Sequence, residues 1–179
     1  MWKWNIREVK IMTEKSYEIV KSDKPKRIRQ SWNEYFMNIA RVLAERSSCD
    51  RAYVGAVIVN QDNRIIATGY NGSVGSKTPQ CDDMGHVMRD GHCIATLHAE
   101  INCIAYCARE GIPLNQSKIY VTHFPCLNCT KALIQSGIKT IYYLDDYRLD
   151  DYALELMKIN GIETIKLEMD EKSKENTGL

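Results

Sequence analysis

Two short segments, well separated in the sequence, restrict the fold of this chain more than any others: His98-Ala99-Glu100 and Pro125-Cys126-Leu127-Asn128-Cys129. They supply one imidazole, two thiols and one further carboxylate, which are the side chains of a catalytic zinc site with three protein ligands and one open position. Zinc lowers the pKa of a water in that position to about 7, and a nearby carboxylate can then carry protons. The fold must therefore bring the histidine and both cysteines together, with Glu100 beside them.

The spacing of apolar residues predicts alternating helices and strands. Ser31 and Glu34 form a capping-box pattern before an amphipathic helix that ends near residues 47–49. Two β-branched runs, 53–59 and 64–70, flank an Asp-Asn turn and predict an antiparallel hairpin. The remaining predicted elements are a helix over 96–109, a strand over 118–122, a helix over 126–136, a strand over 140–144, a helix over 152–159 and a strand over 162–167.

This order predicts an α/β protein with a three-layer α/β/α fold and a five-stranded mixed sheet. We expect the first strand pair to be antiparallel and the remaining strands to be parallel. His98 then begins one helix, and Cys126 and Cys129 begin the next, so that all three can meet at one end of the sheet. A helix N-terminus also lowers the pKa of a thiol and favours the thiolate that zinc requires.

Between the hairpin and the helix of His98 lies a long polar segment, residues 71–95, which begins Asn71-Gly72-Ser73-Val74-Gly75. Its glycines permit positive φ angles and close approach of the backbone to a ligand. A segment of this length inside a compact domain is usually functional or tied down by a metal. We therefore expect it to carry binding groups.

Length and composition exclude several classes of protein. The chain has 179 residues, enough for one domain with a substantial core, and a formal charge of +1, which gives no general attraction to nucleic acid or membranes. It has no apolar run of about 18 residues and no apolar secretory signal. Its seven cysteines, an odd number, favour thiols and metal over a disulfide framework. We expect a cytoplasmic protein.

Three regions differ in character. Residues 1–29 are basic, with Lys24-Pro25-Lys26-Arg27 near the end, and we expect a flexible or loosely docked arm. The alternative is a basic arm that seeks phosphate groups. Residues 30–168 carry every predicted element, and residues 169–179 form a polar tail.

Each part of the zinc pattern has a simpler explanation when it stands alone. A lone histidine on a helix is more often structural, and a lone C-x-x-C occurs in structural zinc sites and redox pairs. A structural site needs a fourth ligand, however, and a redox pair leaves His98 and Glu100 without a role. Taken together, H-x-E followed by P-C-x-x-C is the pattern of zinc nucleobase deaminases.

Residues from about 29 to 168 resemble the deoxycytidylate (dCMP) deaminases, in the branch that includes late-competence-type bacterial proteins. The zinc motifs alone specify only the superfamily. Gly69-Tyr70-Asn71-Gly72, with Cys49 and Gly91-His92-Cys93, narrows the resemblance to the branch that acts on nucleoside monophosphates. The other matching segments are 31–32, 46–49, 54–59, 98–100 and 121–126.

The resemblance implies hydrolysis of dCMP to dUMP and ammonia. His98, Cys126 and Cys129 would hold the zinc, and Glu100 would pass protons from the water to ring N3 and to the leaving amine. The implied substrate contacts are Asn71 with the deoxyribose, Arg51 with the phosphate, and Tyr120, Phe124 or Tyr147 with the pyrimidine, of which Phe124 is preferred because it closely precedes the cysteine helix.

Similar proteins are homohexamers that are activated by dCTP and inhibited by dTTP, with Mg²⁺ accompanying the nucleotide effector. Their effectors bind near the Gly-Tyr-Asn-Gly segment at subunit contacts. The resemblance therefore implies that residues 71–95 are both a wall of the pocket and a regulatory switch.

A second, structural zinc is a further hypothesis. Cys49 and Cys81 lie where some similar proteins place structural zinc thiolates, and His86 and His92 would complete a Cys2His2 site. The alternative is that Cys49 is a buried thiol at a helix end and Cys81 a free thiol in a loop. The remaining cysteines, Cys93, Cys103 and Cys107, are given no chemical role.

Two other functions compete with dCMP deamination. A tRNA or single-stranded DNA deaminase needs a basic groove for several phosphates, which the balanced charge of the chain disfavours. A non-catalytic accessory protein for competence or DNA uptake on the same fold has no need of a proton carrier such as Glu100. We therefore expect dCMP as the partner of the site, with neither nucleic acid nor a membrane.

Overall fold

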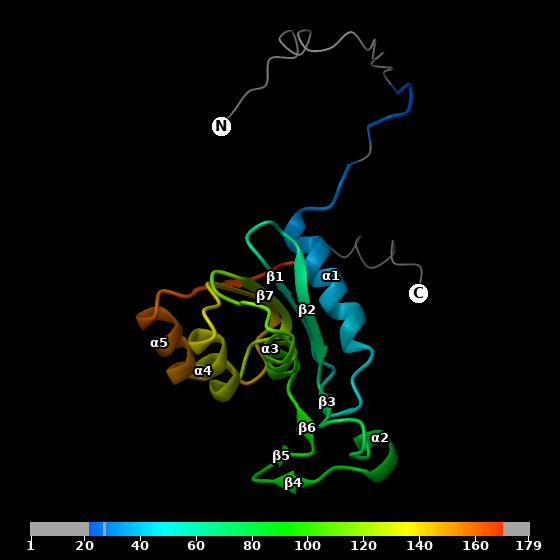
Figure 1. The fold of residues 1–179 in the computed structure, drawn as a ribbon, viewed down its shortest axis with the longest axis vertical. Coiled ribbons are helices and arrows are strands. Elements are labelled where there is room, and N and C mark those ends of the chain that lie inside the picture. The colour runs from blue at the N-terminus through cyan, green and yellow to red at the C-terminus, as the bar shows by residue number, and fades with distance from the viewer. Residues whose placement is uncertain (1–21, 27, 170–179) are drawn as a thin grey trace.

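The centre of the molecule is a five-stranded mixed sheet with the strand order β2-β1-β7-β8-β9 (Figure 1). The computed structural model describes residues 22–26 and 28–169, so most of the predicted arm and tail lies outside the described residues. Strand β1 pairs antiparallel with β2 and with β7, whereas β7, β8 and β9 run parallel. The strands are β1 (Gly55–Val59), β2 (Ile65–Tyr70), β7 (Lys118–His123), β8 (Thr140–Asp145) and β9 (Glu163–Lys166).

Helices cover both faces of this sheet, which confirms the predicted three-layer α/β/α fold (Figure 1). In the part of the chain that the structure describes, one face carries α1 and the other carries α3, α4 and α5. Strand β1 is buried along its whole length, and this explains its unbroken apolar sequence. The helices are α1 (Trp32–Ala44), α3 (Ala99–Glu110), α4 (Leu127–Gln135) and α5 (Asp151–Ile159).

Alternate residues of each strand contribute to two separate cores. Val57 and Val59 pack with Phe36 of α1, whereas Ala56 and Ile58 pack against the face of α3. Each fully buried side chain of the size of valine or phenylalanine stabilises the fold by about 1.5–3 kcal/mol. The two cores together fix the position of the sheet between its helices.

Local features fix where α1 and α3 begin. The capping box before α1 is present: Ser31 Oγ accepts a hydrogen bond from the Glu34 N–H (3.2 Å), and Glu34 Oε2 accepts one from the Ser31 N–H (2.8 Å). Gly69 lets α3 approach β2 closely, because a Cβ at this position would lie 2.5 Å from the Ala99 carbonyl oxygen. This contact fixes the first turn of α3, directly after His98.

The segment expected to be a polar loop contains short elements of its own. They lie together beyond the end of β2 (Figure 1). The helix predicted from Thr96 begins instead at Ala99, because Thr96 and Leu97 pair with Ser73 and Gly72. The short elements are β3 (Gly72–Ser73), α2 (Cys81–Met84), β4 (Met88–Arg89), β5 (His92–Cys93) and β6 (Thr96–Leu97).

Across the described ranges, every helix is too short or too polar to span a lipid bilayer.

Candidate active site

The structure brings the three predicted zinc ligands together. His98 Nδ1 lies 3.5 Å from Cys126 Sγ and 3.4 Å from Cys129 Sγ. A nitrogen and a sulfur bound to one tetrahedral zinc would be separated by about 3.5 Å, given the usual bond lengths. The three donor atoms therefore have the spacing that a shared zinc ion requires.

Their places at helix ends explain why these side chains are free to meet. His98 is the N-cap residue of α3 and Cys126 is the N-cap residue of α4. Neither side chain forms the usual capping hydrogen bond with its own helix. The two side chains point toward each other instead, near the end of the central strand β7.

The electrostatics of this group also suit a cation. A hydrogen bond from Cys129 lowers the pKa of Cys126 to about 4, while its interaction with Cys126 and its burial raise the pKa of Cys129. The hydrogen bond with Cys126 raises the pKa of His98. Two adjacent thiolates repel each other unless a positive charge lies between them, and a divalent metal ion would supply that charge.

Glu100 lies beside the three donors in the first turn of α3. It is only 4% exposed, and this burial raises the pKa of its carboxyl group. A carboxyl group with a raised pKa takes up a proton more readily than an exposed one and can release it again. Glu100 is therefore suited to proton transfer and is not needed as a fourth ligand.

A cavity of about 150 Å³ opens above this group. Four of the five residues predicted to contact a substrate line it: Arg51, Asn71, Phe124 and Tyr147. Asn71 is buried, its Oδ1 accepts a hydrogen bond from the Val54 N–H (2.8 Å), and its Nδ2 donates one to the Ala52 carbonyl (2.8 Å). Each of these two atoms can still form one more hydrogen bond, so Asn71 both braces the wall and can contact a ligand.

The aromatic residues of the wall differ in their surroundings. Phe124 is buried and lies edge-on to Tyr143, whereas Tyr147 is exposed and lies edge-on to His123. Tyr120 does not line the cavity: it points to the other face of the sheet, stacks on Tyr142 and donates a hydrogen bond to Asn33 Oδ1. Residues of a strand alternate between its faces, and this separates Tyr120 from the site.

Three further residues of the wall, His92, His123 and Arg148, had no role in the prediction for the pocket. His123 adjoins Phe124, and Arg148 adjoins Tyr147, so neighbourhood in the sequence was the available signal. Arg148 lies between β8 and α5, where no periodic pattern indicates which side chains face the cavity.

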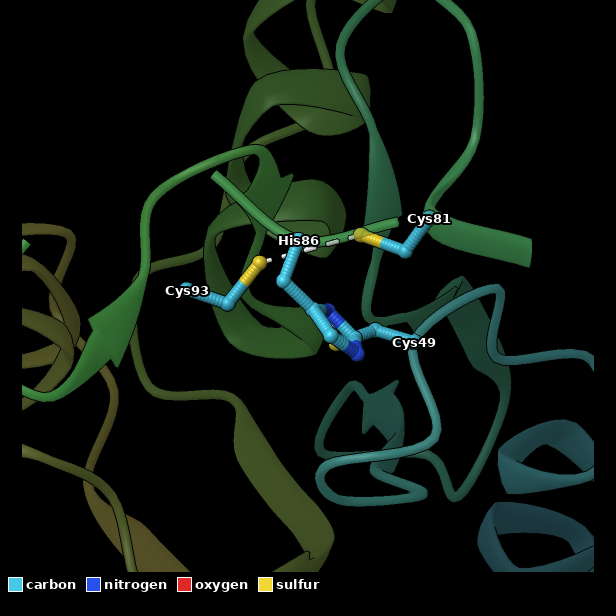
Figure 2. Close-up of side chains that lie close together, drawn as sticks. All are labelled: Cys49, Cys81, His86 and Cys93. Atoms are coloured by element: carbon cyan, nitrogen blue, oxygen red, sulfur yellow. Dashed lines mark hydrogen bonds between the residues drawn. The ribbon is translucent and has the colours of Figure 1, made fainter. Parts of the chain in front are cut away.

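A second group of side chains that could hold a metal ion borders the same cavity. Figure 2 shows Cys49, Cys81, His86 and Cys93 directed toward one another. Cys81 Sγ lies 3.7 Å from Cys93 Sγ, and Cys49 Sγ lies 3.7 Å from His86 Nδ1. Tetrahedral zinc would separate two sulfurs by about 3.8 Å and a sulfur from a nitrogen by about 3.5 Å. We call this group the second cluster.

The structure corrects one of the four ligands predicted for the second zinc site. His92 was expected, but its place is taken by Cys93, and the His92 ring lies against Arg148 instead. Adjacent residues of a strand point to opposite sides, so β5 can direct only one of the two into the cluster. Cys103 and Cys107 are buried in the core.

The surroundings of the second cluster also suit a metal. His86 turns Nδ1 toward the sulfurs, and its Nε2 lies 2.8 Å from Asp50 Oδ1, an arrangement common around histidines that bind metals. Burial raises the pKa of Cys93, but hydrogen bonds with the Ala95 backbone and with His86 outweigh this effect and bring it to about 7. A thiolate is therefore accessible near neutral pH.

A three-layer α/β/α fold, with one histidine and two cysteines at two helix N-termini and a buried glutamate beside them, defines the class of zinc nucleobase deaminases. The family model of the cytidine and deoxycytidylate deaminase zinc-binding region matches residues 30–145, and the chain belongs to this family.

Known proteins resemble the chain closely over this region. ComE operon protein 2 of Bacillus subtilis is 49% identical over 143 residues, which cover 80% of this chain and 75% of that protein. The deoxycytidylate deaminase of Schizosaccharomyces pombe is 35% identical over 146 residues, which cover 78% of this chain but only 45% of the yeast protein. The dCMP deaminase of cyanophage S-TIM5, solved with dCMP and dUMP, has a TM-score of 0.68 and 29% identity over 79% of this chain and all of the phage chain.

Proposed function

We propose that this chain is a zinc-dependent deaminase that hydrolyses dCMP to dUMP and ammonia. The observation that carries the proposal is the position of the buried Glu100. It lies beside three donor side chains whose spacing fits a shared zinc ion, and together they line a cavity. Family membership and the resemblance to named dCMP deaminases support it. The catalytic domain comprises residues 30–168.

The trio His98, Cys126 and Cys129 would hold the zinc ion. When bound, the ion supplies a water whose pKa is lowered to about 7, and hence a nucleophile at neutral pH. The reaction forms a bond between C4 of the pyrimidine and the water oxygen and breaks the bond from C4 to its amino nitrogen. The chain has to supply a proton to ring N3 and another to the leaving amine.

Glu100 performs both proton transfers. Its burial raises the pKa of the carboxyl group, so that it can hold the proton taken from water until N3 or the amine receives it. Phe124 forms an apolar wall against which a pyrimidine ring can pack, and Asn71 offers its remaining donor and acceptor to the deoxyribose. Arg51 at the mouth of the cavity suits the phosphate.

The second cluster would hold a structural zinc. Four protein donors close a tetrahedral site and leave no position for a substrate. From residue 74 to residue 92 only Cys81 is buried and all the other residues are exposed, so apolar packing contributes little to holding this segment. A metal that joined Cys49 to Cys81, His86 and Cys93 would hold it in place.

Regulation completes the proposal. Activation by dCTP with Mg²⁺, inhibition by dTTP and assembly into a homohexamer are expected from the resemblance. Residues 71–95 form the wall through which an effector would act, because Asn71 and Cys93 line the cavity.

Ammonia release on a panel of substrates tests the function. We expect turnover of dCMP, weaker turnover of CMP, little turnover of deoxycytidine and cytidine, and none on a single-stranded oligodeoxynucleotide. Each assay is run with and without dCTP, and zinc is measured in the same preparation. Faster release from the oligonucleotide than from dCMP would favour a nucleic-acid deaminase, and no release from any substrate would favour a non-catalytic role.

A further inference from the structure

The hydroxyl group of Ser47 joins two segments of the chain that border the cavity. Ser47 is buried shortly after the end of α1. Three backbone carbonyl oxygens lie within hydrogen-bond distance of its Oγ: those of Cys49 (3.2 Å), Asn71 (3.2 Å) and Ala52 (3.4 Å). The same Oγ accepts a hydrogen bond from the Cys49 N–H (3.3 Å). One side chain therefore connects the loop after α1 to Asn71, which follows β2.

The three carbonyl oxygens can lie this close together because a hydroxyl group stands between them. Each oxygen carries partial negative charge, and buried carbonyl groups that face one another need a hydrogen-bond donor. The Asn71 carbonyl also accepts from the Ser48 N–H (3.3 Å), and the Ala52 carbonyl accepts from Asn71 Nδ2 (2.8 Å). The hydroxyl hydrogen of Ser47 completes this network, and without it the carbonyl groups would repel one another.

Asn71 depends on the loop after α1 for its position. Its backbone N–H donates to the Val54 carbonyl (3.1 Å), and its side chain is held by the Val54 N–H and the Ala52 carbonyl. Ser47 therefore contacts both the carbonyl of Asn71 and the acceptor that holds its side chain. A shift of the loop would move the remaining donor and acceptor of Asn71 away from their place on the cavity wall.

The contacts with Cys49 tie Ser47 to the second cluster. Cys49, which Figure 2 shows among the four clustered side chains, is bound to Ser47 Oγ through both its N–H and its carbonyl. Cys49, Ala52 and Asn71 line the cavity, whereas Ser47 does not. Ser47 can therefore act on a ligand only through the residues that it holds.

We infer that Ser47 is a positioning residue, whose hydroxyl group holds Asn71 in the place where it contacts the deoxyribose of the nucleotide. The inference rests on the proposed function, which supplies that nucleotide. The contact would form in the bound substrate as well as in the transition state, so its loss weakens binding more than it slows the chemical step. The zinc ligands and Glu100 stand at the starts of α3 and α4 and should be unaffected.

The test compares Ser47→Ala with Ser48→Ala as the matched control. Ser48 is also buried, but its Oγ has no hydrogen-bond partner within residues 22–26 and 28–169, so its removal leaves the network intact. All proteins are loaded with zinc. Calorimetry measures the Kd for dUMP, and steady-state assays give KM and kcat for dCMP. Asn71→Ala and the variant with both Ser47→Ala and Asn71→Ala complete a double-mutant cycle.

We expect Ser47→Ala to raise the Kd for dUMP and the KM for dCMP by about 5- to 30-fold, with kcat within about threefold of wild type. Ser48→Ala should stay within about twofold of wild type in all three, because no partner is lost. The double variant should bind dUMP no more weakly than Asn71→Ala, because Ser47 acts through Asn71. An unchanged Kd for Ser47→Ala, an equal loss in Ser48→Ala, or additive losses in the cycle would overturn the inference.

Deuterium exchange on the wild-type protein gives a second measurement that requires no variant to fold. The Cys49 N–H, which donates to Ser47 Oγ, should exchange at least about fivefold more slowly with dUMP bound, and unchanged exchange there would contradict the inference. If the wild-type protein binds dUMP but does not deaminate dCMP, the proposed function fails, and the cycle of binding constants still decides the role of Ser47. A wild-type protein that binds no dUMP would overturn both.

Discussion

The trio and the second cluster use the same chemical groups, thiols and imidazole, and differ in how many they gather and in what lies beside them. The trio has three donors with Glu100 next to them, whereas the second cluster has four donors with Asp50 behind its histidine. Three donors leave one tetrahedral position for water and substrate, and four leave none. The trio, with three donors and a free carboxylate, is therefore suited to catalysis. The second cluster, with four donors, is suited to joining segments of the chain through a structural metal.

Their supporting structures differ in the same way. His98 and Cys126 stand at the N-termini of helices that pack on the sheet, so the fold positions the trio without help from a metal. Three members of the second cluster come from one segment that is almost entirely exposed: Cys81 from α2, which has four residues, His86 from the loop after it, and Cys93 from β5, which has two. Elements this small cannot bury enough apolar surface to stabilise themselves. The fold around the trio would therefore form with or without its metal. The segment that carries the second cluster would need its metal to keep its structure.

The largest effect should follow from removing the proton carrier. We expect Glu100→Gln to lower kcat for dCMP by about 10³-fold or more, because Glu100 carries the one carboxyl group among the described residues that line the cavity. Zinc content and the Kd for dUMP should stay near wild type. Glu110→Gln, at the exposed end of the same helix, is the control. Turnover within about tenfold of wild type would remove Glu100 from the mechanism.

A pair of serine variants compares the two metal groups directly. Zinc analysis of the wild-type protein should give about two ions per chain, and Cys129→Ser and Cys81→Ser should each give about one. Cys129→Ser should lose activity with little change in Tm, whereas Cys81→Ser should lower Tm by several degrees. One zinc per chain in fully active wild-type protein would eliminate the second site.

Much of the fold and of the trio could be predicted from the sequence, because local residue patterns determine them. The apolar period of α1, the β-branched runs of β1 and β2, and the positions of His98 and Cys126 at the starts of α3 and α4 all follow from residue spacing. The capping box of Ser31 and Glu34 was visible for the same reason.

The wrong predictions concern residues whose side-chain direction depends on the register of a strand. Choosing Cys93 over His92 requires knowing which side of β5 faces Cys49, and a shift of one residue reverses that choice. Tyr120 was misplaced by the same alternation, since its strand turns that side chain toward α1. Arg148 follows the end of a strand, and its direction depends on contacts with Tyr147 and His92 that no sequence pattern encodes.

Limited proteolysis tests whether the second cluster holds its segment of the chain in place, and we expect an effect of intermediate size. Lys77 and Arg89 are exposed in the segment that the second cluster would hold. We expect trypsin to cut Cys81→Ser at these residues about ten times faster than the wild-type protein, because losing the crosslink allows local opening. Cys107→Ala, which changes a buried thiol outside both metal groups, should remain as resistant as wild type in this segment. Equal cutting of Cys81→Ser and wild type would show that packing alone holds the segment.

A smaller effect concerns the packing that positions the trio. A Cβ on Gly69 would lie 2.5 Å from the Ala99 carbonyl oxygen and 2.9 Å from Cys103 Sγ, so Gly69→Ala must push α3 away from β2. We expect a loss of about 1–3 kcal/mol in the free energy of unfolding and a lower kcat, measured by urea denaturation and by ammonia release. Gly72→Ala is the control for stability, because its Cβ would meet neighbours no closer than 3.4 Å. Equal stability of the two variants would contradict a tight contact at α3.

The smallest effect separates the acid sensitivity of the cavity wall from that of the metal ligands. Burial lowers the pKa of His123, although nearby Asp145 opposes the shift. The unfolded chain therefore binds a proton at His123 more readily than the folded chain, and stability falls as the pH drops below the unfolded value of about 6.5. Protonation of cysteine and histidine ligands destabilises metal sites over the same range. With zinc in excess, His123→Asn should make the decline in unfolding free energy between about pH 6.5 and 5 shallower than in the wild-type protein, and an identical slope would assign the acid sensitivity to the ligands alone.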